Sequence, residues 1–299
     1  MNKYKIAAIV VTYNRLELLK NCLVSIEQQT RKPDALFIVD NASSDGTNDF
    51  LKEYKTTYPV HIVTLKENMG GAGGFHSGLK EAYETNLFDA FWIMDDDGIP
   101  DKDCLNNLEL HLDKMSFVAP LVLSIENKED LAFPYLKQTT YREVIDSYPE
   151  GIIHKYANPF NGILLSKILV KKIGYPKEDM FIWGDEVEYL CRAIKNKFIP
   201  HTITKAIHYH PKDRLKKKAF INGNHSIIFT DSKLRNYCKY RNTTYVCKKY
   251  GKTGSSIKYL FKYLVFFLLQ KLDIKNTILF TRAFIDGYSE NFTRHNKYM

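Results

Sequence analysis

The first hundred residues alternate continuous apolar runs with segments of helical periodicity. Apolar runs occupy residues 5–13, 35–39, 60–65 and 91–94. Such runs are typical of strands that are buried on both faces of a parallel sheet. Between the runs, apolar side chains recur every three to four positions, and the last of these helices is expected from about residue 76 to 86. This alternation predicts an α/β fold with a doubly wound, mostly parallel sheet flanked by helices.

The fourth apolar run leads directly into three consecutive carboxylates, Asp95, Asp96 and Asp97. In an open α/β fold, the carboxyl ends of the strands form the edge where ligands bind. Adjacent carboxylates repel one another, so they require a cation or full solvation. Because alternate residues of a strand share a face, Asp95 and Asp97 can converge on one Mg²⁺ or Mn²⁺ ion while Asp96 turns away. The alternative is a solvated acidic turn.

A glycine-rich segment, residues 70–74, follows the third predicted strand. Its backbone N–H groups could approach a phosphate at a helix N-terminus, and a flexible turn is an equal alternative. The segment does not match the dinucleotide-binding fingerprint and does not follow the first strand. A Rossmann-type dehydrogenase is therefore excluded.

Two further groups of reactive side chains lie in the second half of the chain. Asp185 and Glu186 begin a predicted helix, where acids are either favourable charges on the helix dipole or a general base opposite the metal site. His208 and His210 end an alternating, strand-like segment. They are either structural histidines or ligands of the predicted metal ion.

Charge divides the chain into two regions. The 299 residues carry a net charge of +9, yet residues 201–299 hold 20 Lys and Arg against five Asp and Glu. We therefore predict an α/β domain over residues 1–215 and a basic, mostly helical region over residues 216–299. Basic regions of this kind bind anionic membranes or nucleic acid. No nucleic-acid-binding module is recognisable, so nucleic acid is not an expected partner.

Within the basic region, residues 257–272 are strongly apolar but interrupted by three lysines. The uninterrupted apolar stretch is too short to span a bilayer. One interpretation is an interfacial helix whose lysines snorkel to the lipid head groups. The other is a helix that packs on the α/β domain or on another subunit of a homo-oligomer.

The cysteines and the N-terminal residues bear on location. Five cysteines are scattered without CxxC spacing, which is typical of thiols in a reducing compartment. No apolar segment of signal-peptide length precedes the first predicted strand. We expect a cytoplasmic protein that binds peripherally to the inner face of the cell membrane.

As an ordered set, these motifs resemble the nucleotide-sugar glycosyltransferases of family two, which have a GT-A fold. The matching segments are residues 10–15 (VVTYNR), 39–47 (VDNASSDGT), 95–97 (DDD) and 183–186 (WGDE). Residues 68–75 (NMGGAGGF), together with the three aspartates, are most similar to the galactofuranosyltransferase and rhamnosyltransferase-like branch. The resemblance covers residues 5 to about 215.

The resemblance implies a role for each candidate side chain. The residues placed around the donor nucleotide are Thr12, Tyr13, Arg15, Asp40 at the uracil edge, Asn68 near the ribose, Gly71, Asp95 and Asp96. Asp95 and Asp97 would hold Mn²⁺ or Mg²⁺, with His208 as the third ligand and His210 as the competing candidate. Glu186 aligns with the catalytic base, but relatives usually have aspartate there, so Asp185 stays open as well. Trp183 would lie beside the acceptor sugar.

These roles imply an inverting, metal-dependent glycosyltransferase. It would move a sugar from a UDP-sugar, with UDP-galactofuranose favoured, to a hydroxyl of a cell-surface glycan precursor or a lipid-linked glycan. The metal would neutralise the leaving diphosphate, and a carboxylate across the pocket would deprotonate the acceptor. The alternatives are a rhamnosyltransferase that uses dTDP-rhamnose, a nucleotidyltransferase that builds NDP-sugars, and an inactive protein that binds glycans or nucleotide sugars.

Overall fold

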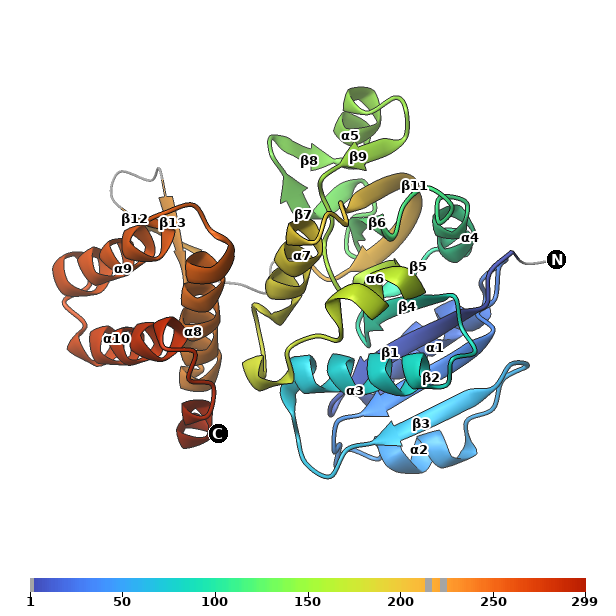
Figure 1. Ribbon diagram of the computed structural model, residues 1–299, viewed down its shortest axis with the longest axis horizontal. Coiled ribbons are helices and arrows are strands. Elements are labelled where there is room, and N and C mark those ends of the chain that lie inside the picture. The colour runs from blue at the N-terminus through green and yellow to red at the C-terminus, as the bar shows by residue number, and fades with distance from the viewer. Residues whose placement is uncertain (1–2, 213–216, 221–224) are drawn as a thin grey trace.

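The computed structural model describes residues 3–212, 217–220 and 225–299. A large α/β body is followed by a group of helices that lies to one side of it (Figure 1). The predicted boundary at residue 215 lies outside the described residues, so the division into two domains stays a prediction.

Four parallel strands form the first half of the main sheet, in the spatial order β3-β2-β1-β4. Their bounds are β1 (Ile6–Thr12), β2 (Ala35–Asp40), β3 (Val60–Thr64) and β4 (Ala90–Asp95). The connecting helices are α1 (Leu16–Glu27), α2 (Thr47–Glu53) and α3 (Gly70–Glu84). The predicted alternation of strands and helices is confirmed in this half.

Beyond β4, the sheet becomes mixed and continues in the order β10-β6-β11-β5. These strands are β10 (Asn161–Ser166), β6 (Phe117–Ser124), β11 (His201–His210) and β5 (Ile99–Pro100). Strand β10 runs antiparallel to both of its neighbours, whereas β6 and β11 are parallel. Short strands extend the edge: β7 (Asp130–Tyr135), β8 (Gln138–Thr140) and β9 (Ile152–His154). The prediction of a mostly parallel sheet holds, with β10 as its main exception.

Helices cover both faces of the sheet because its strands are apolar on both faces. Ala7, Ile9 and Val11 of β1 pack toward α3, while the intervening side chains of β1 pack toward α1. The remaining helices of the body are α4 (Cys104–Glu109), α5 (Tyr141–Ser147), α6 (Lys167–Ile173), the 3₁₀ turn η1 (Glu178–Met180) and α7 (Asp185–Lys195).

The glycine-rich segment corrects one expectation. Helix α3 begins at Gly70, not near residue 76, so the glycines form its first turns. A Cβ atom at Gly74 would lie 2.4 Å from Cγ1 of Val11, and one at Gly70 would lie 2.0 Å from the Phe181 carbonyl oxygen. Glycine is required at these positions because the helix lies in direct contact with β1 and with the loop before α7.

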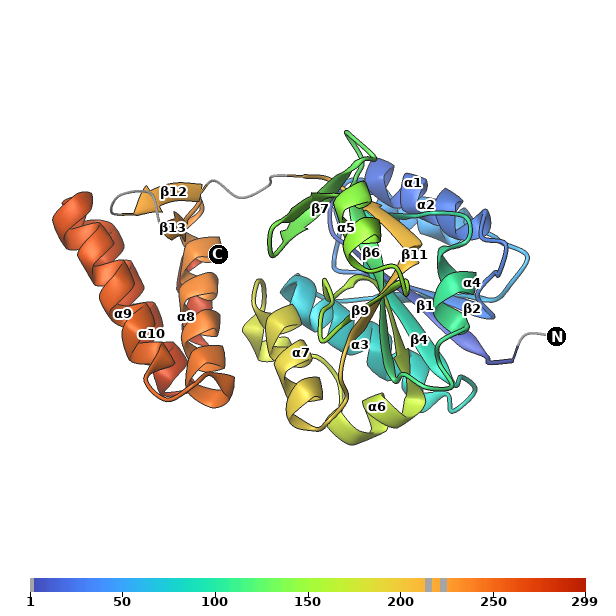
Figure 2. The same ribbon diagram turned by 90° about the horizontal axis from the view of Figure 1, so that it is seen from above.

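The C-terminal helices have an apolar core of their own, formed mainly by aromatic side chains such as Tyr240, Tyr263 and Phe280. The elements of this region are β12 (Lys217–Phe220), β13 (His225–Ile228), α8 (Lys233–Tyr250), α9 (Ser255–Val265), the π-helical turn η2 (Phe266–Gln270), α10 (Ile274–Tyr288) and η3 (Arg294–Tyr298). Helix α8 lies between the body and the α9–α10 pair (Figure 2). Within the described residues, no helix has the length and hydropathy needed to cross a membrane.

Candidate active site

The site begins where three parallel strands end at the same level of the sheet. In the strand register, Thr12 of β1 pairs with Asp40 of β2, and Val11 of β1 pairs with Asp95 of β4. The carboxyl ends of β1, β2 and β4 therefore bring together the residues that the sequence placed around a nucleotide.

Residues at the end of β1 and directly before α1 bind the acidic loop after β4. Thr12 Oγ1 donates to Asp96 at 2.8 Å, and Arg15 Nη1 donates to Asp96 at 3.1 Å and to Asp97 at 2.8 Å. Burial raises the pKa of Asp96 to about 6, although Arg15 and Thr12 oppose the shift. Burial, together with the charges of Asp97 and Asp96, raises the pKa of Asp95 well above its ordinary value. The guanidinium of Arg15 thus bonds to Asp96 and Asp97, and the charge of Asp95 also acts on it.

Two histidines on the same face of β11 approach this loop. Nε2 of His210 lies 3.3 Å from Oδ1 of Asp97, and Nδ1 of His210 lies 2.8 Å from the Pro211 carbonyl oxygen. Because a carbonyl oxygen only accepts, Nδ1 carries the hydrogen and Nε2 is the atom presented to Asp97.

His208 lies deeper than His210. It is fully buried, and neither of its ring nitrogens has a hydrogen-bond partner. A Cβ atom at Gly98 would lie 2.1 Å from its Nε2, so the imidazole ring packs directly on that glycine. Burial lowers the pKa of His208 to about 3, and the ring is therefore neutral.

On the nucleotide side, polar side chains fix the turn that precedes α3. Asn41 donates to Asn68 Oδ1 at 3.2 Å and to the Gly70 carbonyl oxygen at 2.9 Å, and its own Oδ1 accepts from Met69 N–H. Asp40 is buried, with Oδ1 accepting from Ser43 N–H and Oδ2 without a hydrogen-bond partner. Next to this turn, the Cα atom of Gly71 faces open space. Tyr13 is exposed at the rim.

Asp185 and Glu186 begin α7 on the opposite side of the pocket. Glu186 accepts a hydrogen bond from Gly184 N–H at 2.7 Å, and Asp185 is buried. Burial and the neighbouring Glu186 raise the pKa of Asp185 well above its ordinary value, and the charge of Asp95 adds to the shift. The charge of Glu186 likewise raises the pKa of Asp95. The strand-end carboxylates and the α7 carboxylates therefore lie close enough for their charges to act on each other.

Helix α8 holds the loop that carries Trp183. Asn242 Nδ2 donates to the carbonyl oxygens of Met180, Ile182 and Trp183 at 2.9, 3.1 and 2.7 Å. The loop needs this support because Trp183 has a φ of 59° and Gly184 a φ of 102°. The C-terminal region thus contributes to the candidate site.

The residues present fit a divalent cation. Carboxylate oxygens beside a neutral imidazole nitrogen are donors that Mn²⁺ and Mg²⁺ accept. Within the described residues, the side chains do not form a ready-made cluster of three or more metal ligands.

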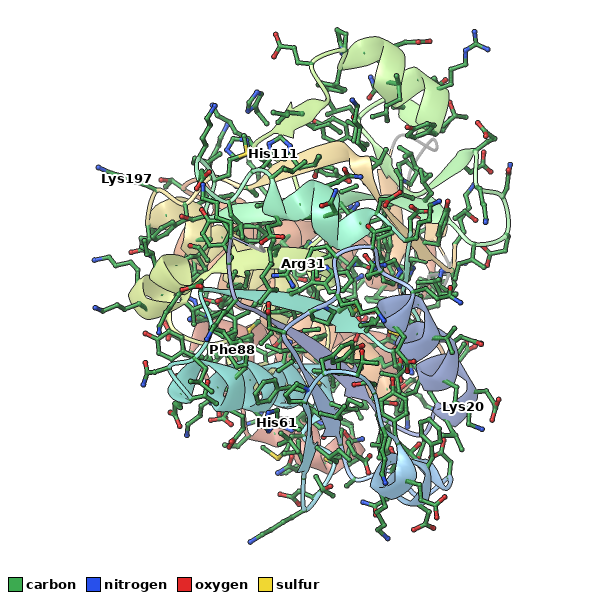
Figure 3. The ribbon with its side chains drawn as sticks, turned by 90° about the vertical axis from the view of Figure 1, so that its right-hand side faces the viewer. Lys20, Arg31, His61, Phe88, His111 and Lys197 are labelled. Atoms are coloured by element: carbon green, nitrogen blue, oxygen red, sulfur yellow. The ribbon has the colours of Figure 1, made fainter. Side chains whose placement is uncertain are left out.

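The opposite end of the molecule carries a depression whose charged side chains are largely paired with one another. It has a volume of about 340 Å³ and is lined in part by Arg31, Glu109 and Asp113. Arg31, near the centre of the face in Figure 3, pairs with Asp34 and Glu109, and Lys3 pairs with Asp113. Because its charges neutralise one another, this depression is a poor candidate for a charged ligand.

Comparison with known proteins agrees with this arrangement. A family model described as Glycosyl transferase family 2 matches residues 7–166. The chain belongs to glycosyl transferase family 2. It is similar to galactofuranosyltransferase GlfT1 of Mycobacterium tuberculosis, with 31% identity over 95% of this chain and 96% of that protein. GlfT1 of Mycolicibacterium smegmatis is 29% identical over 97% of this chain and 98% of that protein.

Among solved structures, this glycosyltransferase is similar to S. aureus TarS 1-349 in complex with UDP-GlcNAc. The TM-score is 0.59 at 15% identity, over 96% of this chain and 82% of that chain. At this identity the likeness concerns the fold alone. It confirms the predicted GT-A fold with a helical C-terminal region.

Sequence reasoning missed two groups of residues in this family 2 glycosyltransferase. Asn41 was visible directly after β2, in the same motif as Asp40, and its position at a strand end was an available signal. Asn242 and its neighbours on α8 gave no signal. Their proximity to the site depends on how a distant helix packs against the body.

Proposed function

We propose that this glycosyltransferase moves a sugar from a UDP-sugar, with UDP-galactofuranose favoured, to a hydroxyl of a cell-surface glycan precursor, with inversion of configuration. The observation that carries the proposal is the mutual effect of the charges of Asp95 and the Asp185–Glu186 pair, each of which shifts the pKa of the other. This proximity supports a phosphate-binding side and a base-bearing side within one site. Similarity to GlfT1 over nearly the whole chain favours galactofuranose as the sugar.

On the donor side, the roles follow from the polar atoms that are present. The buried Oδ2 of Asp40 has no hydrogen-bond partner and would accept the N3–H of uracil. Asn68, fixed by Asn41, would reach the ribose. Thr12, Tyr13, Arg15, Gly71 and Asp96 would surround the nucleotide. The binding of UDP-GlcNAc by TarS, which shares the fold, is consistent with this placement.

Asp95 and Asp97 would hold Mn²⁺ or Mg²⁺ together with a histidine. His210 is the better placed ligand because its Nε2 already faces Asp97, whereas the resemblance favoured His208. When bound, the cation would neutralise charge on the leaving diphosphate. Arg15 would keep Asp96 and Asp97 in place and add a positive charge beneath the phosphates.

The base would act from the start of α7. Glu186 is half-buried and its Oε2 is fixed by Gly184 N–H, whereas Asp185 is fully enclosed. We therefore favour Glu186 for removing the proton of the acceptor hydroxyl, with Asp185 holding it in position. Attack from the side opposite the diphosphate is a single displacement and inverts the anomeric carbon. Trp183, directly before this pair, would lie against the acceptor sugar.

The α9–α10 pair offers a surface for peripheral membrane contact on the cytoplasmic face. Leu269, Leu272 and Ile274 are 73%, 79% and 70% exposed, although the chain turns between the two helices there. Lys271 and Lys275 are exposed among them, next to the apolar residues. Apolar side chains surrounded by lysines complement the interface of an anionic bilayer. We therefore assign this surface to the membrane, and a second copy of the chain is the alternative.

A donor screen tests the reaction. The purified protein is given a glycan acceptor with UDP-galactofuranose, UDP-galactose, UDP-glucose or dTDP-rhamnose, in Mn²⁺ or EDTA, and nucleotide release is measured. We expect release from UDP-galactofuranose that EDTA abolishes. Release only from dTDP-rhamnose would make the protein a rhamnosyltransferase. Nucleotide binding without release from any donor would favour an inactive binding protein. Pyrophosphate release from a nucleoside triphosphate would favour a nucleotidyltransferase.

A further inference from the structure

Two cations of α8 lie close to the indole ring of Trp183. The guanidinium carbon of Arg235 lies 5.7 Å from the ring centroid, and Nζ of Lys239 lies 5.6 Å from it. The two residues are four positions apart in one helix, so they share a face. Both distances are within the range of cation–π attraction.

Among the described residues, no carboxylate forms an ion pair with Arg235 or Lys239, although some other cations nearby are paired or capped. Arg192, for example, pairs with Glu188, and Arg241 donates to the carbonyl oxygens of Met180 and Phe292. Like charges four positions apart in a helix destabilise it. Contacts with the indole ring offset part of this repulsion, and both cations keep their charge available for an anion.

Lys239 is half-buried, and among the described residues the charge of the Glu186 carboxylate acts on it. Burial lowers the pKa of Lys239, as expected for a cation without a close counter-ion. Asn242 of the same helix binds the Trp183 carbonyl oxygen at 2.7 Å. The distance between the two cations and the candidate base is thus fixed by the contact that positions the loop.

We propose that Arg235, Lys239 and Trp183 form an anion subsite that binds a phosphate group of the acceptor. This inference rests on the proposed function and names the class of acceptor that the same site takes. A sugar ring would stack on the indole, and the phosphate attached to it would lie between the two cations. Two positive charges match a phosphate monoester or a diphosphate, and arginine offers paired donors that fit phosphate oxygens. The phosphate belongs either to a lipid diphosphate linker or to the glycan itself.

The test compares acceptors that differ only in this group: one glycan as its methyl glycoside, as its phosphate monoester and as a short-chain lipid diphosphate. Wild type should prefer the phosphorylated forms. Because a charged hydrogen bond contributes up to a few kcal/mol, Arg235→Gln and Lys239→Gln should each raise KM for these forms by about tenfold more than for the methyl glycoside. Lys233→Gln, an exposed lysine of the same helix, is the matched control. A preference for the lipid diphosphate over the monoester would identify the linker as the source.

A binding measurement separates this inference from the proposed function. Inorganic pyrophosphate is titrated in EDTA with saturating UDP, and tryptophan fluorescence is followed. Trp92 is fully buried, so a change reports on Trp183. Saturable binding that is lost in the Arg235→Gln/Lys239→Gln variant supports the subsite even if no donor is turned over. No binding by wild type, or equal loss of turnover on neutral and phosphorylated acceptors, would overturn it.

Discussion

At the residue scale, the acidic loop brings three carboxylates together in a largely buried position. Among the described residues, the guanidinium of Arg15 bonds to Asp96 and Asp97, and burial raises the pKa of both Asp95 and Asp96. Perturbed carboxylates of this kind are typical of functional sites. Two predictions concern the charges of this loop and the neighbouring imidazole rings.

Asp96→Asn should remove a pH dependence of stability. An unfolded aspartate titrates near pH 4, whereas the pKa of folded Asp96 is about 6. Between these two pKa values, the folded state binds a proton that the unfolded state has released. The free energy of unfolding therefore falls as the pH rises from about 4 to about 6. Relative to the variant, metal-free wild type should lose on the order of 2 kcal/mol of unfolding free energy across this window.

Urea titrations in EDTA at several pH values across this window provide the measurement. Asp49→Asn is the control, because Asp49 is exposed and the adjacent Lys52 lowers its pKa. If the unfolding free energies of wild type and Asp96→Asn change with pH in parallel, Asp96 is already ionised in the folded protein.

Replacing His208 and His210 separately should reveal which of the two binds metal. His210→Ala should weaken Mn²⁺ binding in the presence of UDP by tenfold or more, on the order found for disrupted metal sites. His208→Ala should instead lower thermal stability, because its ring fills the space between Gly98 and Gly162. The reverse pattern in calorimetric Mn²⁺ titrations would restore His208 as the ligand, and His154→Ala, an exposed histidine, controls for nonspecific effects.

At the element scale, two contacts position the two sides of the site. Helix α3 packs closely on β1, and helix α8 binds the loop that carries Trp183. Local sequence predicted β1, β2, β4 and the acidic loop, because continuous apolar runs and the polar residues after them are local signals. It misplaced the start of α3, since glycines that serve close packing look like turn residues until their neighbours are known. It could not find Asn242, whose partners lie about 60 residues away in the chain.

Gly74→Ala should destabilise the protein by about 1–3 kcal/mol, because the added methyl group would lie 2.4 Å from Val11 Cγ1. Gly71→Ala is the matched control in the same helix, as no atom lies within 4 Å of its added methyl group. It should keep or raise stability, since alanine favours helix by up to about 1 kcal/mol, and should weaken UDP binding. Equal denaturation midpoints for the two variants would contradict the packing explanation.

Asn242→Ala should uncouple binding from turnover. Loss of three hydrogen bonds frees the loop that carries Trp183 and leads to Glu186, so turnover should fall by at least about tenfold while UDP affinity changes little. Asn236→Ala is the control, because this buried asparagine of α8 bonds only near Thr230. If both variants lose turnover in proportion to stability, the loop is not the cause.

At the scale of the whole molecule, the α/β body and the α9–α10 pair lie on opposite sides of α8 (Figure 2). The sequence predicted the basic character of the C-terminal region and the amphipathic stretch 257–272. It left open whether that stretch binds membrane or packs. In the structure Phe266 and Phe267 are buried while Leu269 and Leu272 are exposed, so one stretch provides both an internal core and an external surface.

Wild type should sediment with vesicles that contain anionic lipid and much less with purely zwitterionic vesicles. The double variant Leu269→Glu/Leu272→Glu should lose this binding and keep its fold, because both side chains are exposed. Leu110→Glu, an equally exposed leucine on the body, is the control and should bind like wild type. Concentration-dependent dimers without vesicle binding would assign the surface to a second copy.

The hydrogen bonds from Asn242 also set an order of events during synthesis. The α/β body emerges from the ribosome first and can fold as a unit. Its loop at residues 180–184 contacts α3 of the body through the hydrogen bond from Ala72 N–H to the Phe181 carbonyl oxygen, but it gains the bonds from Asn242 only after α8 has been made. A nascent chain should therefore bind nucleotide before it can transfer sugar, which delays catalysis until α8 is in place.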